Sequence, residues 1–536
     1  MRQWMVAAKK ADFYAIAEKF HVDPVVARII RNREVIGEKN IRIYLGGNLS
    51  DLSDPHQMKD MDRLVEILAQ KIRKQVHIRI IGDYDVDGVT SSHLFLTALR
   101  RVGAKVDVVI PHRIQDGYGL SLHLLQQAKE DGVDTILTCD NGIAAIDEIA
   151  WAKAQKMTVL VTDHHAVPFE EHEGRRTEKK SLADAVVNPH QQDCGYPYKE
   201  LCGAGVAWNV IRVLYENYDM DKREAEDLLD FVAMATVCDV MSLTGENRIL
   251  VKEGLKRIRH TKNIGLQALM QACNVQPENI SAYHFGYVLG PCVNATGRLD
   301  TARHALRLFE TGQETEAEEI ARDLVDLNQE RKELTLQGVE MAKKLCEEGG
   351  YENDPVLVLF LPDVHESIAG LIAGRIREMY NRPVFVLTRG EEGVKGSGRS
   401  TENYSMYENM CGCAELFTKF GGHPMAAGLS LPEENVEKFR RKINENCPLT
   451  VEEVCPDIHI DMAMPVGYAS TELVHQFALL EPFGKDNPSP LFADRNLSIS
   501  RMWLIGKNRN VLRMSVLSEY GQPVPVIFFG DVETLF

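Results

Sequence analysis

The chain has 536 residues and a formal net charge of −17 at pH 7. This length exceeds what one hydrophobic core supports, so we expect about two to four domains. The acidic balance argues against a surface coated with basic groups, although a local basic groove and bound metal could still bind a polyanion. The longest apolar stretches are strand-sized and the N-terminal one is short, so we expect neither a transmembrane helix nor a secretory signal.

Eleven cysteines are scattered along the chain, and no pair has the CxxC spacing. An odd number of unpaired cysteines does not suggest a disulfide framework, and without paired thiolates there is no zinc-type ligand set. The pattern favours a reduced, cytoplasmic location.

Residues 1–75 have helical apolar spacing and form the first expected segment. From residue 76 the pattern changes to short apolar strands alternating with helices such as Ser91–Val102 and Leu120–Lys129. The expected strands are His77–Ile81, Lys105–Ile110, Thr135–Thr138, Thr158–Val161 and Ala185–Val187. This alternation is typical of a parallel sheet with helices on both faces, and we assign it to an α/β domain spanning 76–312.

The stretch Glu314–Glu348 predicts one long charged helix of about 50 Å. Its sparse apolar residues suggest a connector (313–350) that holds two domains apart, and the alternative is a plain surface helix of one domain. A second α/β domain is expected over 351–448, with strands Pro355–Leu361 and Pro383–Thr388. Residues 455–536 contain three clear strands, which indicates a small OB-like β-barrel whose completeness stays open.

Acidic and histidine clusters follow several of the expected strands. They are Asp83-Tyr84-Asp85-Val86-Asp87-Gly88, Cys139-Asp140-Asn141-Gly142, Asp163-His164-His165 and, near the end of an expected helix, Cys238-Asp239-Val240. In an open α/β sheet the carboxyl ends of the strands form one ligand-binding edge, so the clusters should meet there. Asp85 and Asp87 alternate in what looks like an extended loop, which would turn both carboxylates to one side.

Hard oxygen ligands with imidazole favour Mn²⁺ or Mg²⁺ over structural zinc. Taken singly, an Asp-Asn-Gly run is usually a turn and a His-His pair is usually a surface feature. Four clusters in this order argue for a cation, because stacked carboxylates need positive charge to stay ionised.

The ordered clusters resemble the four motifs of the DHH phosphoesterase superfamily. The Gly396-Ser397-Gly398-Arg399-Ser400 run and Gly421-Gly422-His423-Pro424-Met425 resemble the DHHA1 domain that accompanies it. With Leu480-Glu481-Pro482-Phe483-Gly484 and a barrel behind it, the chain is similar to the RecJ-type single-strand-specific exonucleases from about residue 75 onward. The resemblance implies a metal-dependent 5′→3′ exonuclease that hydrolyses single-stranded DNA to mononucleotides in DNA repair and recombination.

The resemblance also implies the roles of the cluster residues. Asp85, Asp87, Asp140, His164 and Asp239 would bind two Mn²⁺ or Mg²⁺ ions. Asp83 would ligate or support them, Asp163 would orient a histidine, and His165 would contact the scissile phosphate. The DNA and 5′-phosphate contacts would come from Arg113, Tyr118, Arg298, Ser397, Gly398, Arg399 and His423. The Gly396–Ser400 segment is expected to be a glycine-rich loop whose backbone N–H groups cradle an anion.

One position departs from the pattern: Cys292 stands where the family often has arginine. The implied partners are single-stranded DNA, a RecQ-type helicase and a single-strand-binding protein. Two other hypotheses keep the same residues. One is a phosphodiesterase for short oligonucleotides or cyclic dinucleotides, which would not need the extra barrel. The other is a catalytically dead binding subunit, which the intact ligand set argues against.

Overall fold

The computed structural model describes residues 3–113, 116–117, 119–172, 175–299, 301–351, 354–390, 393–449, 457–506, 510–530 and 532. The chain forms two compact bodies. The larger comprises Ser53–Met241 and Glu253–Pro456, and the smaller comprises Arg2–Leu52, Ser242–Lys252 and Asp457–Phe536. Among the described residues, no helix is long and apolar enough to cross a membrane.

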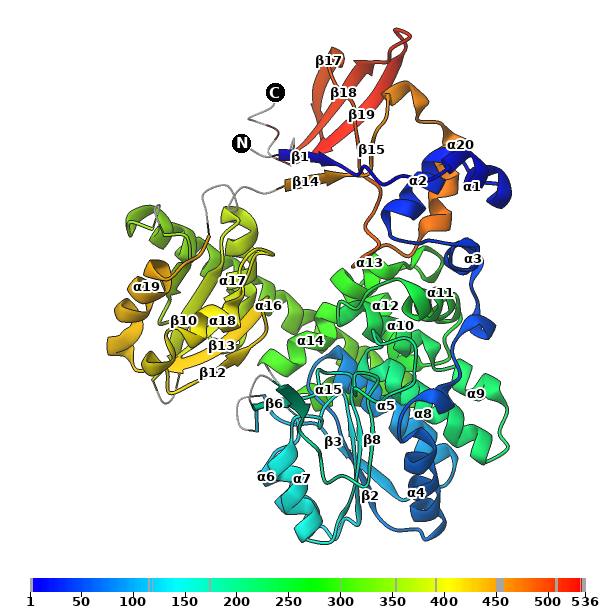
Figure 1. The fold of residues 1–536 in the computed structure, drawn as a ribbon, viewed down its shortest axis with the longest axis vertical. Coiled ribbons are helices and arrows are strands. Elements are labelled where there is room, and N and C mark those ends of the chain that lie inside the picture. Colours follow the sequence, from blue (N-terminus) through cyan, green and yellow to red (C-terminus); the bar gives the residue numbers. More distant parts are fainter. Residues whose placement is uncertain are drawn as a thin grey trace. The chain divides into compact units, whose positions relative to one another are not determined.

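The larger body begins with a five-stranded parallel sheet in the order β3-β2-β4-β5-β8. Its strands are β2 (Ile78–Ile81), β3 (Val106–Val109), β4 (Thr135–Cys139), β5 (Thr158–Thr162) and β8 (Ala185–Val187), with a separate hairpin of β6 (Phe169–His172) and β7 (Arg175–Glu178). Helices α6 (Leu122–Glu130) and α7 (Ile146–Ala154) cover one face, and α4 (Met61–Arg73) and α8 (Gly203–Asn217) cover the other (Figure 1). The predicted parallel α/β sheet is confirmed.

A helical layer completes this domain. It contains α5 (Val86–Arg101), α9 (Lys222–Glu226), α10 (Leu229–Cys238), α11 (Gly245–Ile258), α12 (Ile264–Ala272), α13 (Ala282–His284), η4 (Phe285–Leu289), α14 (Gly290–Leu299) and α15 (Ala302–Glu310), although the first turns of α11 belong to the smaller body. Helix α5 is buried along nearly its whole length, because it packs against α8, α10 and α15. It therefore fixes the positions of the residues at its N-terminus.

The long helix α16 (Glu314–Glu348) forms over the predicted residues and packs against α12 and α14 on one part and α17 (Glu366–Tyr380) on another. Beyond it lies a second sheet in the order β12-β13-β11-β10-β9. Its strands are β9 (Leu357–Phe360), β10 (Val384–Gly390), β11 (Gly393–Arg399), β12 (Lys419–Gly422) and β13 (Ala426–Leu431). Helix α17 packs on one face, and α18 (Met406–Cys411) and α19 (Val436–Glu445) pack on the other.

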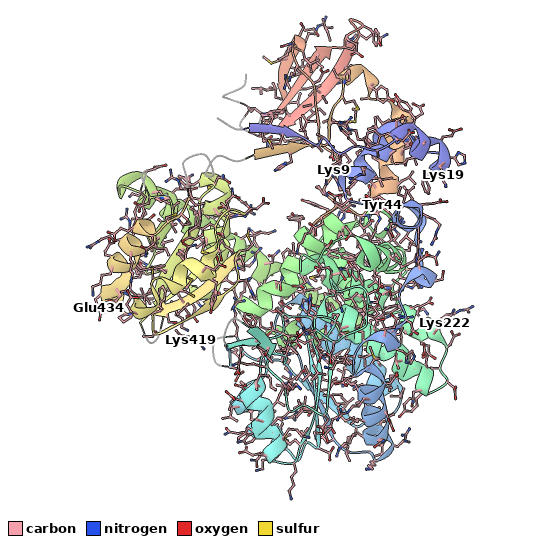
Figure 2. All side chains as sticks on the ribbon, in the orientation of Figure 1. Lys9, Lys19, Tyr44, Lys222, Lys419 and Glu434 are labelled. Atoms are coloured by element: carbon pink, nitrogen blue, oxygen red, sulfur yellow. The ribbon has the colours of Figure 1, made fainter. Side chains whose placement is uncertain are left out.

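The smaller body joins both chain ends. Strand β1 (Gln3–Val6) pairs in parallel with β14 (Asp457–Ile460). The strand β1 lies in residues 1–75, which were expected to be helical. Helices α1 (Phe13–Phe20), α2 (Pro24–Asn32), α3 (Glu38–Gly46) and α20 (Thr471–Phe477) share one core, in which Arg248 donates to the carbonyls of Tyr44 and Leu480 (Figure 2 labels Tyr44). Strands β15 (Met462–Ala463) and β16 (Phe492–Ala493) pair, and β17 (Ser498–Ile505), β18 (Val511–Leu517) and β19 (Pro523–Phe529) form an antiparallel sheet.

Candidate functional site

The carboxyl edge of the first sheet collects the predicted acidic clusters. Asp83 follows β2, Asp140 follows β4 and Asp163 follows β5, and because the three strands are parallel neighbours their ends meet at one edge. Asp239 joins them as the residue that ends α10. Asp83, Asp87, Asp140 and Asp163 are each no more than 2% exposed. The sequence reasoning thus predicted the location of the cluster.

The local geometry of Asp85 and Asp87 differs from the extended loop expected above. Asp85 caps helix α5 by accepting a hydrogen bond from the Gly88 amide (3.0 Å), and Asp87 lies in the first turn of that helix. The helix starts earlier than predicted because Asp85 supplies this cap. The carboxylate of Asp87 accepts from the amides of Gly203 (2.6 Å) and Ala204 (2.7 Å), so it also binds the N-terminus of α8.

His164 lies at the centre of the acids. Its Nε2 is 3.1 Å from Asp140 Oδ1, 3.6 Å from Asp239 Oδ2 and 3.7 Å from Asp87 Oδ2, and it makes no hydrogen bond of good geometry. Among the described residues there are three sets of possible ligands, and within each set the ligand atoms lie within 4.8 Å of one another. They are Asp87, His164 and Asp239; Asp140, His164 and His165; and Asp83, Asp85 and Asp140. All five predicted metal ligands are therefore together, with Asp83 and His165 beside them.

Burial and mutual repulsion perturb these acids. Burial raises the pKa of Asp140 well above its ordinary value, and Asp87, Asp85, Asp239 and Asp83 raise it further. The pKa values of Asp83 and Asp85 rise for the same two reasons. Burial lowers the pKa of His164, which keeps its imidazole neutral. A buried set of hard oxygen ligands with one neutral imidazole fits a divalent cation. The cation would offset the repulsion between the carboxylates and would be coordinated by His164 Nε2 and the oxygens around it.

Asp163 belongs to the same edge but has a different environment. It accepts hydrogen bonds from the amides of Ile143 (2.9 Å), His164 (2.7 Å) and His165 (3.1 Å), and from His165 Nδ1 (2.8 Å). Burial would raise the pKa of Asp163, but the hydrogen bond from His165 and the two histidines lower it overall. Burial also opposes protonation of His165, yet the bond to Asp163 raises the pKa of His165 to about 9. Asp163 therefore orients His165 and favours its protonated form.

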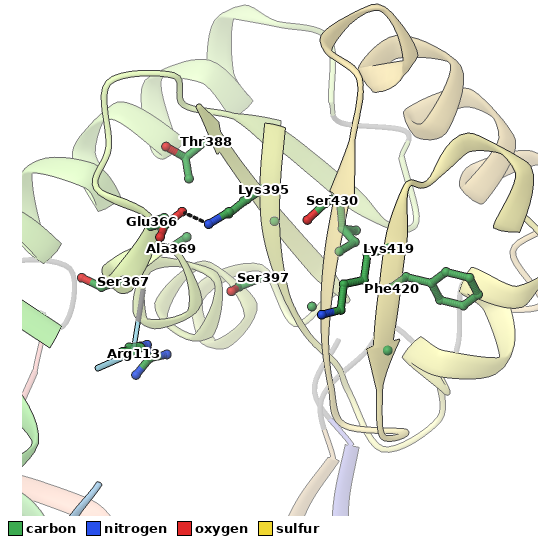
Figure 3. A pocket seen from close by; sticks show the side chains of 14 residues that line it. Arg113, Glu366, Ser367, Ala369, Thr388, Lys395, Ser397, Lys419, Phe420 and Ser430 are labelled. Carbon is green, nitrogen blue, oxygen red and sulfur yellow. Dashed lines mark ion pairs between the residues drawn. The ribbon is translucent and has the colours of Figure 1, made fainter. Parts of the chain in front are cut away.

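A cavity of about 390 Å³ lies where Arg113 faces the second sheet (Figure 3). Ser367 of α17, Lys395 and Ser397 of β11, and Lys419 of β12 line it with Arg113. Lys395 is paired with Glu366 at 2.9 Å, and Figure 2 also labels Lys419. Such a set of cations and hydroxyls suits a phosphate group.

Arg298 and Arg399 do not line this cavity, but together with Arg113 and Arg331 they form a cationic cluster. Burial lowers the pKa of Arg298 to about 9, and Arg113, Arg331 and Arg399 contribute by repulsion. Arg298 donates to the Ser367 carbonyl (2.6 Å), which joins α14 to α17. Buried guanidinium groups that repel one another favour an anion between them.

The Gly396–Ser400 segment is not a loop, as its sequence suggested. Its residues up to Arg399 form β11, an interior strand paired with β10 and β13, so its amides belong to the sheet. Gly396 and Gly398 instead avoid collisions, because a Cβ there would lie 2.4 Å from Leu387 Cδ2 and 2.7 Å from Phe385 Cε1. The alternate residues Lys395, Ser397 and Arg399 point to the α17 face. Lys395 was missed, and treating this run as a strand would have found it.

Other predicted contacts are less well placed. Gly398 lies in β11, and a Cβ at this position would point into the hydrophobic core rather than into the cavity, which Gly398 does not line. His423 follows β12 in the turn to β13 and does not line the cavity. Tyr118 lies outside the described residues. Asn294 was missed: its Oδ1 accepts from the Val86 amide (3.1 Å) and so holds the turn between Asp85 and Asp87.

Comparisons with known proteins agree with this arrangement. Sequence models match the DHH family, N-terminal domain, at residues 77–236, the DHHA1 domain at 353–447 and the RecJ OB domain at 460–536. The Haemophilus influenzae single-stranded-DNA-specific exonuclease RecJ is 34% identical over 518 residues, which cover 93% of this chain and 88% of that protein. The chain belongs to the RecJ family. The OB-like domain expected at the C-terminus is thereby confirmed.

Other RecJ family members extend the comparison. The Bacillus subtilis single-stranded-DNA-specific exonuclease RecJ is 33% identical over 95% of this chain, which spans 63% of that relative's length. The crystal structure of RecJ in complex with Mn²⁺ from Thermus thermophilus superposes with a TM-score of 0.81 at 26% identity, covering 99% of this chain and 79% of that one.

Proposed function

We propose that this chain is a metal-dependent 5′→3′ exonuclease that hydrolyses single-stranded DNA to mononucleotides. The observation that carries the proposal is the pairing of two sites in one body. A buried acidic set fit for divalent cations lies at the sheet edge, and a cationic set containing Arg113, Arg298 and Arg399 lies near it. Asn294 and Arg298 are one helical turn apart on α14, so a single helix braces both sites.

The names of the relatives support the substrate and the cofactor. Several are single-stranded-DNA-specific exonucleases, and two solved RecJ structures are complexes with Mn²⁺ and Mg²⁺. We therefore propose that Asp85, Asp87, Asp140, His164 and Asp239 bind two such ions. When bound, the ions would polarise the phosphodiester and activate a water molecule for its hydrolysis.

The chain's own residues would position the substrate. Asp163 fixes the ring of His165, whose protonated imidazole can donate a hydrogen bond to a phosphate oxygen. Arg113 and Ser397 would bind the 5′-terminal phosphate in the cavity, and Arg298 and Arg399 would neutralise it from behind. A strand held by its terminal phosphate presents the next phosphodiester to the acids, and this gives the 5′→3′ polarity.

The test is digestion of single-stranded DNA labelled at either end, with Mn²⁺ or Mg²⁺ and the full chain. We expect mononucleotides from the 5′ end, none from blunt duplex and none from Asp140→Ala. Preference for dinucleotides over a long strand would instead favour a phosphodiesterase for short substrates. Activity that survives Asp140→Ala would contradict the metal assignment.

We further propose a cytoplasmic role in DNA repair and recombination, in which a RecQ-type helicase supplies the strand and a single-strand-binding protein covers it. The OB domain supports the use of a long strand, since such domains bind single-stranded nucleic acid. A pull-down of each purified partner by the full chain, with a strand present and absent, tests the two contacts.

A further inference from the structure

Two cysteines from different helices meet behind the cationic cluster. Cys273 ends α12 and Cys292 lies in α14, and their Sγ atoms are 3.8 Å apart. A disulfide bond needs about 2.0 Å, so closure requires the sulfurs to approach by roughly 1.8 Å. Cys292 is only 2% exposed, whereas Cys273 is partly exposed and can meet a reagent from solvent.

The surroundings of the pair favour attack by Cys273. The contact with Cys292 lowers the pKa of the Cys273 thiol, against the effect of burial, and the ammonium of Lys332 lowers it further. The pKa of Cys292 rises because of the contact with Cys273 and because of burial, and its thiol donates to the Val288 carbonyl (3.3 Å). One exposed nucleophilic thiol beside one protected thiol is the arrangement of a reacting and a resolving cysteine.

The pair also touches the cationic cluster. The Asn328 amide Nδ2 lies 3.4 Å from Cys292 Sγ, and Asn328 Oδ1 accepts from Arg331 Nε (3.1 Å) and Nη2 (2.8 Å). Arg331 and Lys332 line a cavity of about 690 Å³ with Asn294 and Arg298. A displacement of the Cys292 sulfur would therefore move Arg331 through the side chain of Asn328. It would also affect Asn294, which lies in the same helix α14.

We propose that Cys273 and Cys292 are a redox modification site that closes to an intramolecular disulfide and weakens strand binding by displacing Arg331, which lines a cavity with Arg298. The oxidant is a hydroperoxide such as hydrogen peroxide. The Cys273 thiolate attacks one peroxide oxygen, so that an S–O bond forms, the O–O bond breaks and the departing hydroxide becomes water. Cys292 then attacks the sulfenic sulfur, an S–S bond forms, and the S–O bond breaks with release of a second water.

The two thiols together lose two electrons and two protons, and the peroxide is reduced to two waters. A dithiol reverses the step by two thiol–disulfide exchanges. The new bond ties α12 to α14 and draws Cys292 Sγ towards Cys273, which disturbs its contact with Asn328. The weakening of strand binding rests on the proposed function, whereas the formation of the disulfide does not.

The experiment treats the reduced full chain with increasing hydrogen peroxide, blocks remaining thiols by alkylation and maps cysteines by mass spectrometry. We expect a Cys273–Cys292 linked peptide at peroxide concentrations about tenfold below those that oxidise the exposed Cys411. The matched control, Cys411→Ser, should form the same peptide. In Cys273→Ser, Cys292 should stay reduced at that dose. Oxidation of Cys411 before any linked peptide appears would overturn the proposal.

Strand binding and digestion are measured on the same samples. Oxidised wild type should bind a single strand several-fold more weakly and recover with dithiothreitol, whereas Cys273→Ser should not change. A linked peptide without any loss of binding would contradict the link to Arg331. If reduced protein binds DNA without cleaving it, the proposed nuclease function fails, while the linked peptide and the binding loss still support the modification site.

Discussion

Asp140→Asn should have opposite effects on the stability and the function of this protein. The change is nearly isosteric, and it suits the backbone because Asp140 has φ 61°, a left-handed conformation that asparagine also tolerates. Asp140 shares a ligand group with Asp83 and Asp85 whose oxygens lie within 4.8 Å. Two full charges at that distance repel by about 3 kcal/mol at an effective dielectric constant of about 20.

Burial and this repulsion raise the pKa values of all three acids, so removing one carboxylate charge relieves the other two. A net gain of about 1–3 kcal/mol in the free energy of unfolding is therefore expected for metal-free Asp140→Asn at pH 8. The sign follows from linkage: acids with raised folded pKa values bind protons more tightly when folded, so the wild type loses stability as pH rises through those values. The gain should fade towards about pH 4, the ordinary pKa of aspartate.

The assay is thermal unfolding of chelator-treated protein at pH 5 and pH 8, with and without Mn²⁺. Wild type should gain about 2.7 kcal/mol when Mn²⁺ is at a hundred times its Kd, and Asp140→Asn should gain much less. The matched control is Asp163→Asn, which removes a carboxylate satisfied by three backbone amides and His165, and it should lower stability. A metal-free Asp140→Asn that melts below wild type at pH 8, with its Mn²⁺ response intact, would refute this reasoning.

Three further changes test other contacts. Gly203→Ala should reduce Mn²⁺ affinity about tenfold or more without changing charge, because the new Cβ would lie 2.6 Å from Asp140 Cβ, and calorimetric titration measures it. Arg399→Ala should remove most of the preference for a 5′-phosphorylated over a 5′-hydroxyl strand, measured by KM, with Mn²⁺ binding unchanged. Burial raises the pKa of Asp230 to about 6, although the hydrogen bond from the Thr261 hydroxyl lowers it. The protonated Asp230 therefore contributes stability that is fully present below about pH 4 and is lost as the pH rises through 6. Asp230→Asn should flatten that loss, by up to about 3 kcal/mol, in denaturant titrations at pH 4.5 and pH 7.5.

The sequence predicts the sheet edge well, because strand period, turn residues and parallel order are local properties. The strands that precede Asp83, Asp140 and Asp163 form within one residue of their expected ends, and parallel pairing then brings the three acids together. The sequence predicts less about hydrogen bonds between residues that are far apart in the chain. The amides of Gly203 and Ala204, which bind Asp87 from 116 and 117 residues away, carry no local signal.

Local pattern also misled where a strand looked like a loop. Glycines at 396 and 398 suggested an anion-binding loop, yet their spacing of two is that of a strand whose inner face has no room for side chains. The outer face then presents Lys395, Ser397 and Arg399 in a row. On the α17 side the close approach is permitted by Gly370, where a Cβ would lie 2.9 Å from Arg399 Nη2.

Asp140 and Asp163 show what sequence alone leaves undecided. Both follow buried strands of the same sheet, and both are nearly inaccessible to solvent. Their difference lies in the groups around them: Asp163 accepts four hydrogen bonds within its own edge, whereas Asp140 has acids on several sides. The hydrogen bonds to the first carboxylate lower its pKa, and it orients His165, whereas burial and the neighbouring acids raise the pKa of the second, so a cation would favour its anion. Equal residues at equal positions are therefore proposed to act as a positioning group and as a ligand, because the charges around each one differ.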